Sequence, residues 1–138
     1  MKSAGYSGTP LWKKLGIKSG QTVFLYKPPQ DFHSLLEGMP ENVRFLKLVR
    51  KKIDFIHIFA RDSHELRIAI EKYRHKIKDD GMIWVSWYKK AAKIPTDVTE
   101  DTIREVCLPT GLVDVKVCAV DEKWSGLKLV IRKELRGQ

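Results

Sequence analysis

Apolar residues in this chain gather in short continuous runs that predict buried strands. Three runs, Thr22–Tyr26, Ile53–Phe59 and Met82–Trp87, contain few polar positions and have the length of a typical strand. Continuous apolar runs are typical of strands that are covered on both faces, as in a parallel sheet. Val43–Val49 is a weaker run of the same kind and predicts one further strand.

Helix signals alternate with these strands. Leu11–Leu15 and Asp31–Glu37 each predict a short helix, the first preceded by a proline of the kind found at helix starts. Asp62 and Glu65 have the spacing of a capping box and predict the start of the longest helix, whose apolar residues recur at helical spacing. Thr99 predicts the N-cap of one more helix.

The C-terminal part follows a different pattern. Leu112–Val120 and Leu127–Ile131 resemble strands, and the residues between them, Asp121–Gly126, hold no helix, which predicts an antiparallel hairpin. Asp80–Gly81 is predicted as the turn before the third apolar run. The whole pattern predicts a single three-layer, Rossmann-like α/β domain over residues 1–138, with a mostly parallel sheet and a C-terminal antiparallel hairpin.

Composition agrees with one folded domain and limits its setting. The chain has 138 residues, 43% of them hydrophobic, and no apolar run approaches the length of a membrane span. Residues Met1–Tyr6 lack the apolar stretch of a secretory signal, so we expect a cytoplasmic protein without a membrane partner. Cys107 and Cys118 have neither metal-ligand nor redox spacing, which predicts two free thiols in a reducing compartment.

The net charge points to an anionic partner. Lys and Arg number 26 against 17 Asp and Glu, which gives a formal charge of +9. A basic surface favours nucleic acid, nucleotides or small phosphorylated molecules as ligands. These cations are spread along the chain and form no basic tail, so a small anionic ligand is favoured and nucleic acid is kept as an alternative.

Two resemblances accompany this pattern. Leu15–Leu25, Ile53–Ile56 and Asp80–Val85 resemble the first, fourth and fifth strand regions of class I methyltransferases, which have a Rossmann-like fold. The chain also resembles a family of short bacterial proteins that is described only as a domain of unknown function. That second resemblance is carried by Gly5–Leu11, Trp84–Trp87, Lys89–Ala91, Thr96–Asp101 and Gly111–Val130. It implies a fold and no activity.

The cofactor signals of a methyltransferase are missing. After the first strand the fold uses a glycine-rich turn, whereas this chain has Pro28 and Pro29, which remove two N–H donors. After the second strand it uses an acid that holds the ribose, whereas Leu48–Lys52 contains no carboxylate. We therefore expect no bound cofactor and no conventional catalysis.

No other catalytic or metal constellation is apparent in the sequence. The four histidines, His33, His57, His64 and His75, lack metal-ligand spacing, and no nucleophile elbow or phosphate-binding glycine loop is found. His57 lies within an apolar strand, which predicts a structural, hydrogen-bonded side chain. We assign no catalytic residue and no metal ligand.

One edge of the sheet is the candidate ligand site. In open α/β sheets, ligands bind outside the carboxyl ends of the parallel strands. The residues that the pattern brings to that edge are Lys27, Arg61, Ser63, Lys89, Lys90, Asp121, Trp124 and Ser125. The positive charges among them, on Lys27, Arg61, Lys89 and Lys90, are expected to repel one another unless an anion binds between them.

The leading hypothesis from the sequence is a non-catalytic domain that binds a small anionic or nucleotide-like ligand at this edge. Two alternatives stay open. One is a divergent S-adenosylmethionine-dependent methyltransferase, and the other is a nucleic-acid or protein interaction module that uses the basic surface.

Overall fold

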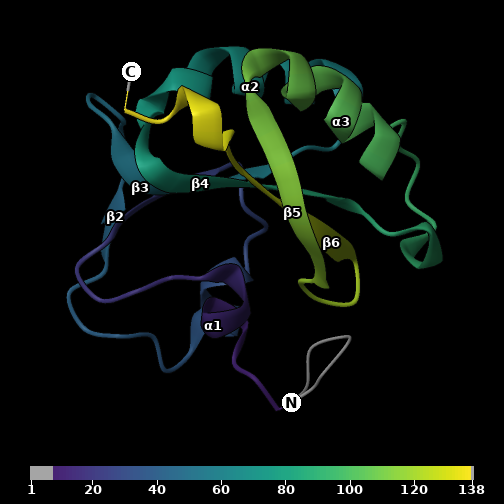
Figure 1. Ribbon diagram of the computed structural model, residues 1–138. Coiled ribbons are helices and arrows are strands. Elements are labelled where there is room, and N and C mark those ends of the chain that lie inside the picture. Colours follow the sequence, from purple (N-terminus) through teal and green to yellow (C-terminus); the bar gives the residue numbers. More distant parts are fainter. Residues whose placement is uncertain (1–7, 138) are drawn as a thin grey trace.

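A six-stranded mixed sheet forms the centre of the molecule in the computed structural model, which describes residues 8–137 (Figure 1). In spatial order the strands are β2 (Arg44–Leu46), β1 (Thr22–Tyr26), β3 (Ile53–Phe59), β4 (Ile77–Tyr88), β6 (Trp124–Ile131) and β5 (Leu112–Ala119). The first four are parallel, and β6 runs antiparallel to both β4 and β5. The predicted fold class is confirmed. The N-terminal residues Met1–Tyr6 and the start of Gly5–Leu11 lie outside the described residues.

Helices cover both faces of this sheet. One face carries α2 (Ser63–Tyr73) and α3 (Glu100–Cys107), and the other carries α1 (Leu11–Leu15) and the 3₁₀ helix η1 (Phe32–Leu36) (Figure 1). Short 3₁₀ turns complete the chain: η2 (Arg74–Lys76), η3 (Lys90–Ala92), η4 (Leu108–Thr110) and η5 (Lys133–Leu135). No helix of the described chain is long and apolar enough to cross a membrane.

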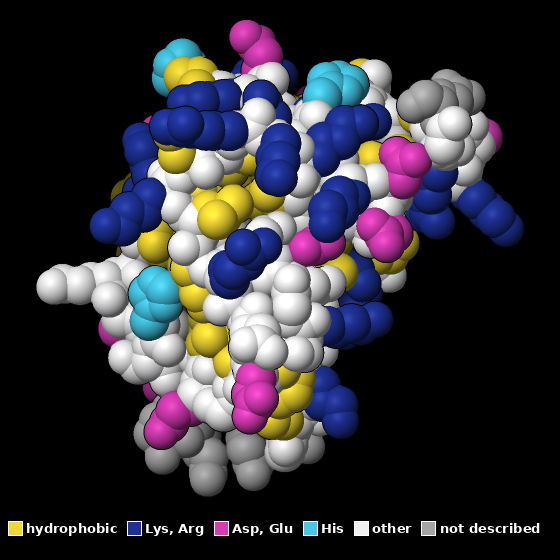
Figure 2. Space-filling view, turned by 90° about the vertical axis from the view of Figure 1, so that its left-hand side faces the viewer, with side chains coloured by type: hydrophobic (Ala, Val, Ile, Leu, Met, Phe, Trp, Pro, Cys, Tyr) yellow, Lys and Arg dark blue, Asp and Glu magenta, His cyan; other side chains and the backbone are white. Residues whose placement is uncertain are grey.

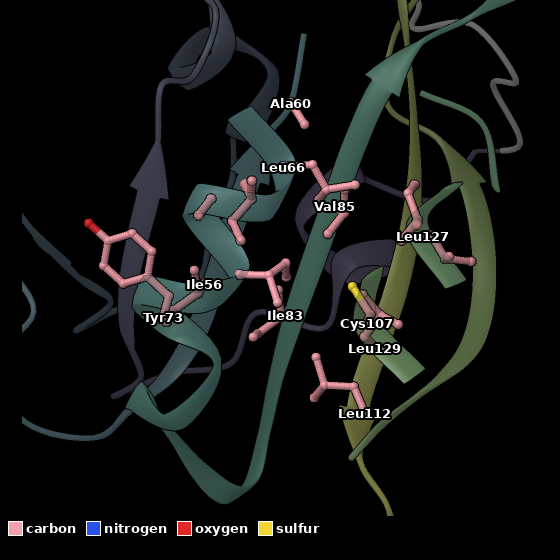
Figure 3. Packing of buried hydrophobic residues seen from close by; sticks show 14 of the residues in the cluster. Ile56, Ala60, Leu66, Tyr73, Ile83, Val85, Cys107, Leu112, Leu127 and Leu129 are labelled. Atoms are coloured by element: carbon pink, nitrogen blue, oxygen red, sulfur yellow. The ribbon is translucent and has the colours of Figure 1, made fainter. Parts of the chain in front are cut away.

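Two hydrophobic cores result, one on each face. Figure 3 shows the first, in which Leu66 and Tyr73 of α2 pack towards Ile56 of β3 and Ile83 of β4. The second core contains Phe55 of β3, together with Trp84 of β4 and side chains from α1 and η1. Strands β3 and β4 contribute to both cores, as their continuous apolar runs predict.

The strand limits differ from the sequence prediction where backbone geometry intervenes. Asp80–Gly81 was predicted as a turn but lies inside β4, at an irregularity where the pairing shifts from Ile53 with Ile77 to Phe55 with Met82. A Cβ atom on Gly81 would lie 2.9 Å from the Asp54 carbonyl oxygen, so this close approach of two backbones requires glycine.

Two other strands also have unexpected lengths. Strand β2, at the edge of the sheet beside β1, covers only Arg44–Leu46, whereas Val43–Val49 was predicted. Strand β6 begins at Trp124, so the hairpin turn is shorter than the predicted Asp121–Gly126.

The helix caps are largely as predicted. The Asp62 carboxylate accepts the N–H of Glu65 at 2.7 Å, but the Glu65 carboxylate accepts the N–H of Arg61 at 2.8 Å, so the predicted capping box is only half formed. Thr99 and Thr102 form a complete capping box at α3.

His57 is buried in the middle of β3. Its Nε2 lies 2.7 Å from the hydroxyl oxygen of Ser86 on β4, and its ring stacks on Phe59 with centroids 4.2 Å apart. The expected structural, hydrogen-bonded histidine is confirmed. Burial lowers the pKa of His57 to about 3, so the ring is neutral at physiological pH.

The central strands should dominate stability. Phe55 and Ile83 are fully buried, and Phe55→Ala or Ile83→Ala should lower the free energy of unfolding by roughly 2–5 kcal/mol through lost burial and cavity formation. Chemical denaturation measures this change. Ile68→Ala, at an exposed position of α2, is the matched control and should shift stability by less than about 0.5 kcal/mol. Near-neutral effects of both core variants would contradict the assigned packing.

His57 should make stability fall in mild acid. Its pKa is about 3 when folded against 6.5 in the unfolded chain, so the unfolded state takes up a proton first as the pH drops. Below pH 6.5 the free energy of unfolding should decrease by up to about 1.4 kcal/mol per pH unit. Urea titrations between pH 7 and pH 5, where ordinary carboxylates stay ionised, should show this slope.

Substitution of the histidine isolates this effect. His57→Gln cannot titrate and should flatten the pH dependence, whatever its stability at pH 7. His64→Gln, at an exposed position, should leave the slope as in the parent. A His57→Gln slope equal to that of the parent would show that another group is responsible.

Candidate functional site

A cavity of about 490 Å³ lies at the carboxyl edge of the parallel strands. It is bordered by the segments that follow β1, β3 and β4 and by the turn between β5 and β6. Its lining consists of Pro29, Asp31, Leu35, Arg61, Tyr88, Ile94, Asp121, Glu122, Lys123 and Trp124. Cavities of this size hold ligands of nucleotide dimensions.

Arg61 is held in place at this cavity by the backbone. Its Nη1 donates to the carbonyl oxygens of Lys27 at 3.0 Å and Phe59 at 3.3 Å, and its guanidinium lies 5.3 Å from the ring centre of Trp124. Within residues 8–137, its Nε and Nη2 have no hydrogen-bond partner. A fixed guanidinium with free donors is a ready-made anchor for an oxyanion.

Aromatic side chains form the wall beneath Arg61. Trp124 is only 3% exposed and packs against Tyr88, with ring centres 4.3 Å apart, and edge-on against Phe59 at 5.2 Å. Tyr88 is partly exposed and lines the cavity. The wall therefore offers apolar surface beside a cation.

The rim of the cavity is mixed in charge. Lys123 adds a second cation to Arg61, while carboxylates come from three acidic residues, Asp31, Asp121 and Glu122. One oxygen of Asp121 accepts the N–H groups of Lys123 and Trp124, both at 2.8 Å, and so shapes the hairpin turn. The cavity can accept hydroxyl or amino groups at its carboxylates as well as an anion at Arg61.

Three of the residues predicted from the sequence line this cavity: Arg61, Asp121 and Trp124. The other five, Lys27, Ser63, Lys89, Lys90 and Ser125, do not. Ser125 is paired with Trp87 in the sheet. Lys89 lies beside the hairpin turn, where its N–H donates to the carbonyl oxygen of Lys123 at 2.9 Å.

Glu65 relieves the charge repulsion expected between Lys27 and Arg61. Its carboxylate lies 3.0 Å from the Lys27 amine and 3.8 Å from the Arg61 guanidinium. The hydrogen bond to Glu65, with its negative charge, raises the pKa of Lys27. The sequence showed Glu65 only as a capping residue and so concealed this role.

The N-terminus of α2 is already occupied by a protein carboxylate. Asp97 accepts the backbone N–H of Ser63 at 2.8 Å and also its hydroxyl. The same hydrogen bonds lower the pKa of Asp97. Ser63 therefore anchors the segment that precedes α3, and its amide is not open to an external anion.

Several lining residues were missed by the sequence reading. Asp31 was assigned to a helix start, and Leu35 and Ile94 were not assigned to the site. The usable signal was position, because Asp31 lies two residues after Pro29 in the segment that follows β1, at the carboxyl edge. Nothing in the sequence near Ile94 indicated that its loop returns there.

The positions at which a methyltransferase holds its cofactor do not fit that role here. Lys27 takes a left-handed conformation with φ +50° at the end of β1, and Pro28 and Pro29 follow it. The segment after β2, residues 47–52, contains no carboxylate. A donor-rich turn and a ribose-binding acid are both missing. The described residues also hold no cluster of three or more His, Cys, Asp or Glu side chains suited to a metal.

A separate basic surface lies on the β2 side of the molecule. Figure 2 shows this face, on which Lys and Arg side chains gather around a band of apolar side chains. In the part of the chain described here, no ion pair is formed by the exposed cations of β2 and the following loop. These cations are Arg44, Lys47, Arg50, Lys51 and Lys52.

Solved structures of methyltransferases share the fold. A S-adenosylmethionine-dependent methyltransferase from Aquifex aeolicus is 16% identical, with a TM-score of 0.60 and 88% of each chain covered. Fibrillarin from Aeropyrum pernix, solved with natively bound S-adenosyl-L-methionine, is 12% identical, with a TM-score of 0.58 over 91% of this chain and 70% of that one. The ribosomal protein L11 methylase from Lactobacillus delbrueckii subsp. bulgaricus is 13% identical, with a TM-score of 0.57 over 88% and 74%.

These similarities establish the methyltransferase-like fold, and the identities are too low to carry an activity. No curated protein matches the sequence. A family model described as a protein of unknown function, DUF3052, matches residues 13–133. The chain therefore belongs to the DUF3052 family, as its resemblance to a domain of unknown function implied.

Proposed function

We propose that this domain binds a small nucleotide-like ligand in the carboxyl-edge cavity without conventional catalysis. The observation that carries the proposal is Arg61, whose Nη1 is fixed by two backbone carbonyls while Nε and Nη2 are free to bind an anion. A guanidinium whose orientation is already fixed loses little conformational entropy when it binds a phosphate.

The remaining lining supports the same ligand class. Asp31 and Glu122 are exposed carboxylates that can accept ribose hydroxyls or amino groups. Tyr88 and Leu35 provide apolar surface for a ring. A simple inorganic anion would bind Arg61, but the nearby carboxylates would repel it. A nucleotide can place its phosphate at Arg61 and its hydroxyl or amino groups at the carboxylates.

A divergent methyltransferase is the alternative at the same cavity. The fold favours it, and the prolines after β1 and the missing acid after β2 oppose it. Saturable binding of S-adenosylmethionine with a low-micromolar dissociation constant would favour the enzyme. Under our proposal this compound binds no tighter than the high micromolar range.

Arg61 should control nucleotide affinity. Adenosine monophosphate should bind most tightly at one site per chain, and Arg61→Lys should weaken this binding at least tenfold, about 1.4 kcal/mol, because lysine keeps the charge and loses the planar set of donors. Isothermal titration calorimetry gives both constants. The double variant Lys89→Ala with Lys90→Ala removes two cations near the cavity but outside its lining, and should bind like the parent. Equal affinity of the parent and Arg61→Lys would refute the proposed anchor.

The basic β2 surface supports a second candidate function, binding of single-stranded nucleic acid. Its cations have no protein counterions in the described chain, and Leu48 among them is 61% exposed, so a polyanion with apolar bases would complement this face. The proposal concerns a different surface from the nucleotide cavity.

Salt dependence tests this second candidate. The double variant Arg50→Gln with Lys51→Gln should weaken binding of an unstructured oligouridine. It should also make the negative slope of log K, the association constant, against log salt shallower by about 1.4, because it removes two phosphate contacts at about 0.7 each. Fluorescence anisotropy over a salt series measures the slope. Lys89→Ala with Lys90→Ala should leave it unchanged. A parent slope near zero, or equal slopes for parent and β2 variant, would exclude this surface.

A further inference from the structure

A second cavity, of about 270 Å³, lies at the opposite, amino edge of the sheet. It is formed where α2 ends, where β3 and β4 begin and where β6 finishes. Its lining consists of Lys52, Arg74, His75, Ile77, Asp79, Thr110, Ile131 and Leu135. It shares no residue with the carboxyl-edge cavity.

Arg74 is the unusual member of this lining. The residue is only 7% exposed, yet within residues 8–137 no carboxylate lies within ion-pair distance of its guanidinium. Its one hydrogen bond runs from Nε to the carbonyl oxygen of Thr110, at 2.7 Å. Its Nη1 and Nη2 therefore remain without a partner in the described chain. These two nitrogen atoms keep contact with solvent in the cavity, so they are open to an anion, and the guanidinium has no counterion in the described chain.

The surroundings hold Arg74 towards the cavity. A Cβ atom on Gly111 would lie 3.0 Å from the Arg74 Nη2, and Gly111 has φ +92°, so glycine leaves room for the guanidinium and fits the turn. The carboxylate of Asp79, which also lines the cavity, accepts the N–H of Gly137 at 2.6 Å and forms no ion pair with Arg74. Burial lowers the pKa of Arg74, in agreement with a guanidinium that lacks a nearby negative charge.

Further donors converge on the same space. Lys52, at the start of β3, and His75, next to Arg74 in η2, both line the cavity, and neither forms an ion pair within the described chain. Lys52 supplies a flexible ammonium group and His75 an imidazole that can donate an N–H. Together with the free face of Arg74, this donor set matches an anion with several oxygens.

We infer that this amino-edge cavity is a binding site for a small tetrahedral oxyanion, as free phosphate or as the phosphate group of a small monoester. Arg74 binds it through Nη1 and Nη2, and Lys52 adds a second charge. The bound anion links the end of α2 to the start of β3. This site is independent of the nucleotide cavity, and the usual rule for α/β sheets does not predict it, because that rule concerns the carboxyl edge.

Phosphate-dependent unfolding tests the inference. At constant ionic strength set with sodium chloride, phosphate should raise the midpoint of thermal unfolding in a saturable manner with a millimolar apparent dissociation constant, because it binds the folded chain only. Glycerol phosphate should act likewise if monoesters are accepted, and a response to free phosphate alone would restrict the site to the free anion.

Variants locate the effect. Arg74→Gln keeps a donor near Thr110 but removes the charge, and should abolish the saturable stabilisation. Lys52→Gln should weaken the apparent affinity for phosphate about tenfold. This variant tests the site even if Arg74→Gln fails to fold. Lys89→Ala with Lys90→Ala removes two cations outside both cavities and should respond to phosphate like the parent. Binding of adenosine monophosphate to Arg61→Lys is a separate measurement, so this inference and the nucleotide proposal can fail separately.

Two outcomes would overturn the inference. One is a parent protein that phosphate stabilises no more than chloride does. The other is an unchanged phosphate response in Lys52→Gln and in any folded Arg74→Gln.

Discussion

The burial of β3 and β4 on both faces is the constraint on which the rest of the molecule depends. Phe55, Ile56, Ile83 and Trp84 are all fully buried, so each of these strands needs a cover above and below. Helices α2 and α3 supply one cover, and α1 with η1 supplies the other. Because the central parts of these strands have no solvent-exposed face, the polar side chains that line the two cavities come from the ends of the strands and from the segments that follow or precede them.

This arrangement explains why the two cavities lie at opposite edges of the sheet. At the carboxyl edge, the chain leaves β1, β3 and β4 and meets the hairpin turn, which brings Arg61 over Trp124. At the amino edge, α2 ends and places Arg74 in the cavity, next to Gly111. Both arginines are positioned by backbone carbonyls and keep unused donors. The fold is that of methyltransferases, but the turn and the acid that serve their cofactor are replaced here.

The elements that depend on local pattern could be predicted from the sequence. Strands β1 and β3 occur at the predicted residues, because continuous apolar runs and their flanking turns specify them directly. Features that depend on contacts between distant segments could not. Gly81 looked like a turn residue because the close approach of Asp54 was unknown. Three such contacts join residues far apart in sequence: Lys27 with Glu65, Ser63 with Asp97, and Arg74 with Thr110. No periodicity or spacing in the sequence reveals them.

Nuclear magnetic resonance with ¹⁵N-labelled protein gives the most direct test of the central claim, that the carboxyl-edge cavity is the ligand site of this domain. Adenosine monophosphate would be titrated while the side-chain Nε–H signals of Arg61 and Trp124 and the backbone amides of the hairpin turn are followed. Our account predicts saturable shifts of these signals with one common dissociation constant. Shifts that are confined to the β2 surface or to Arg74, or no saturable shift, would contradict it.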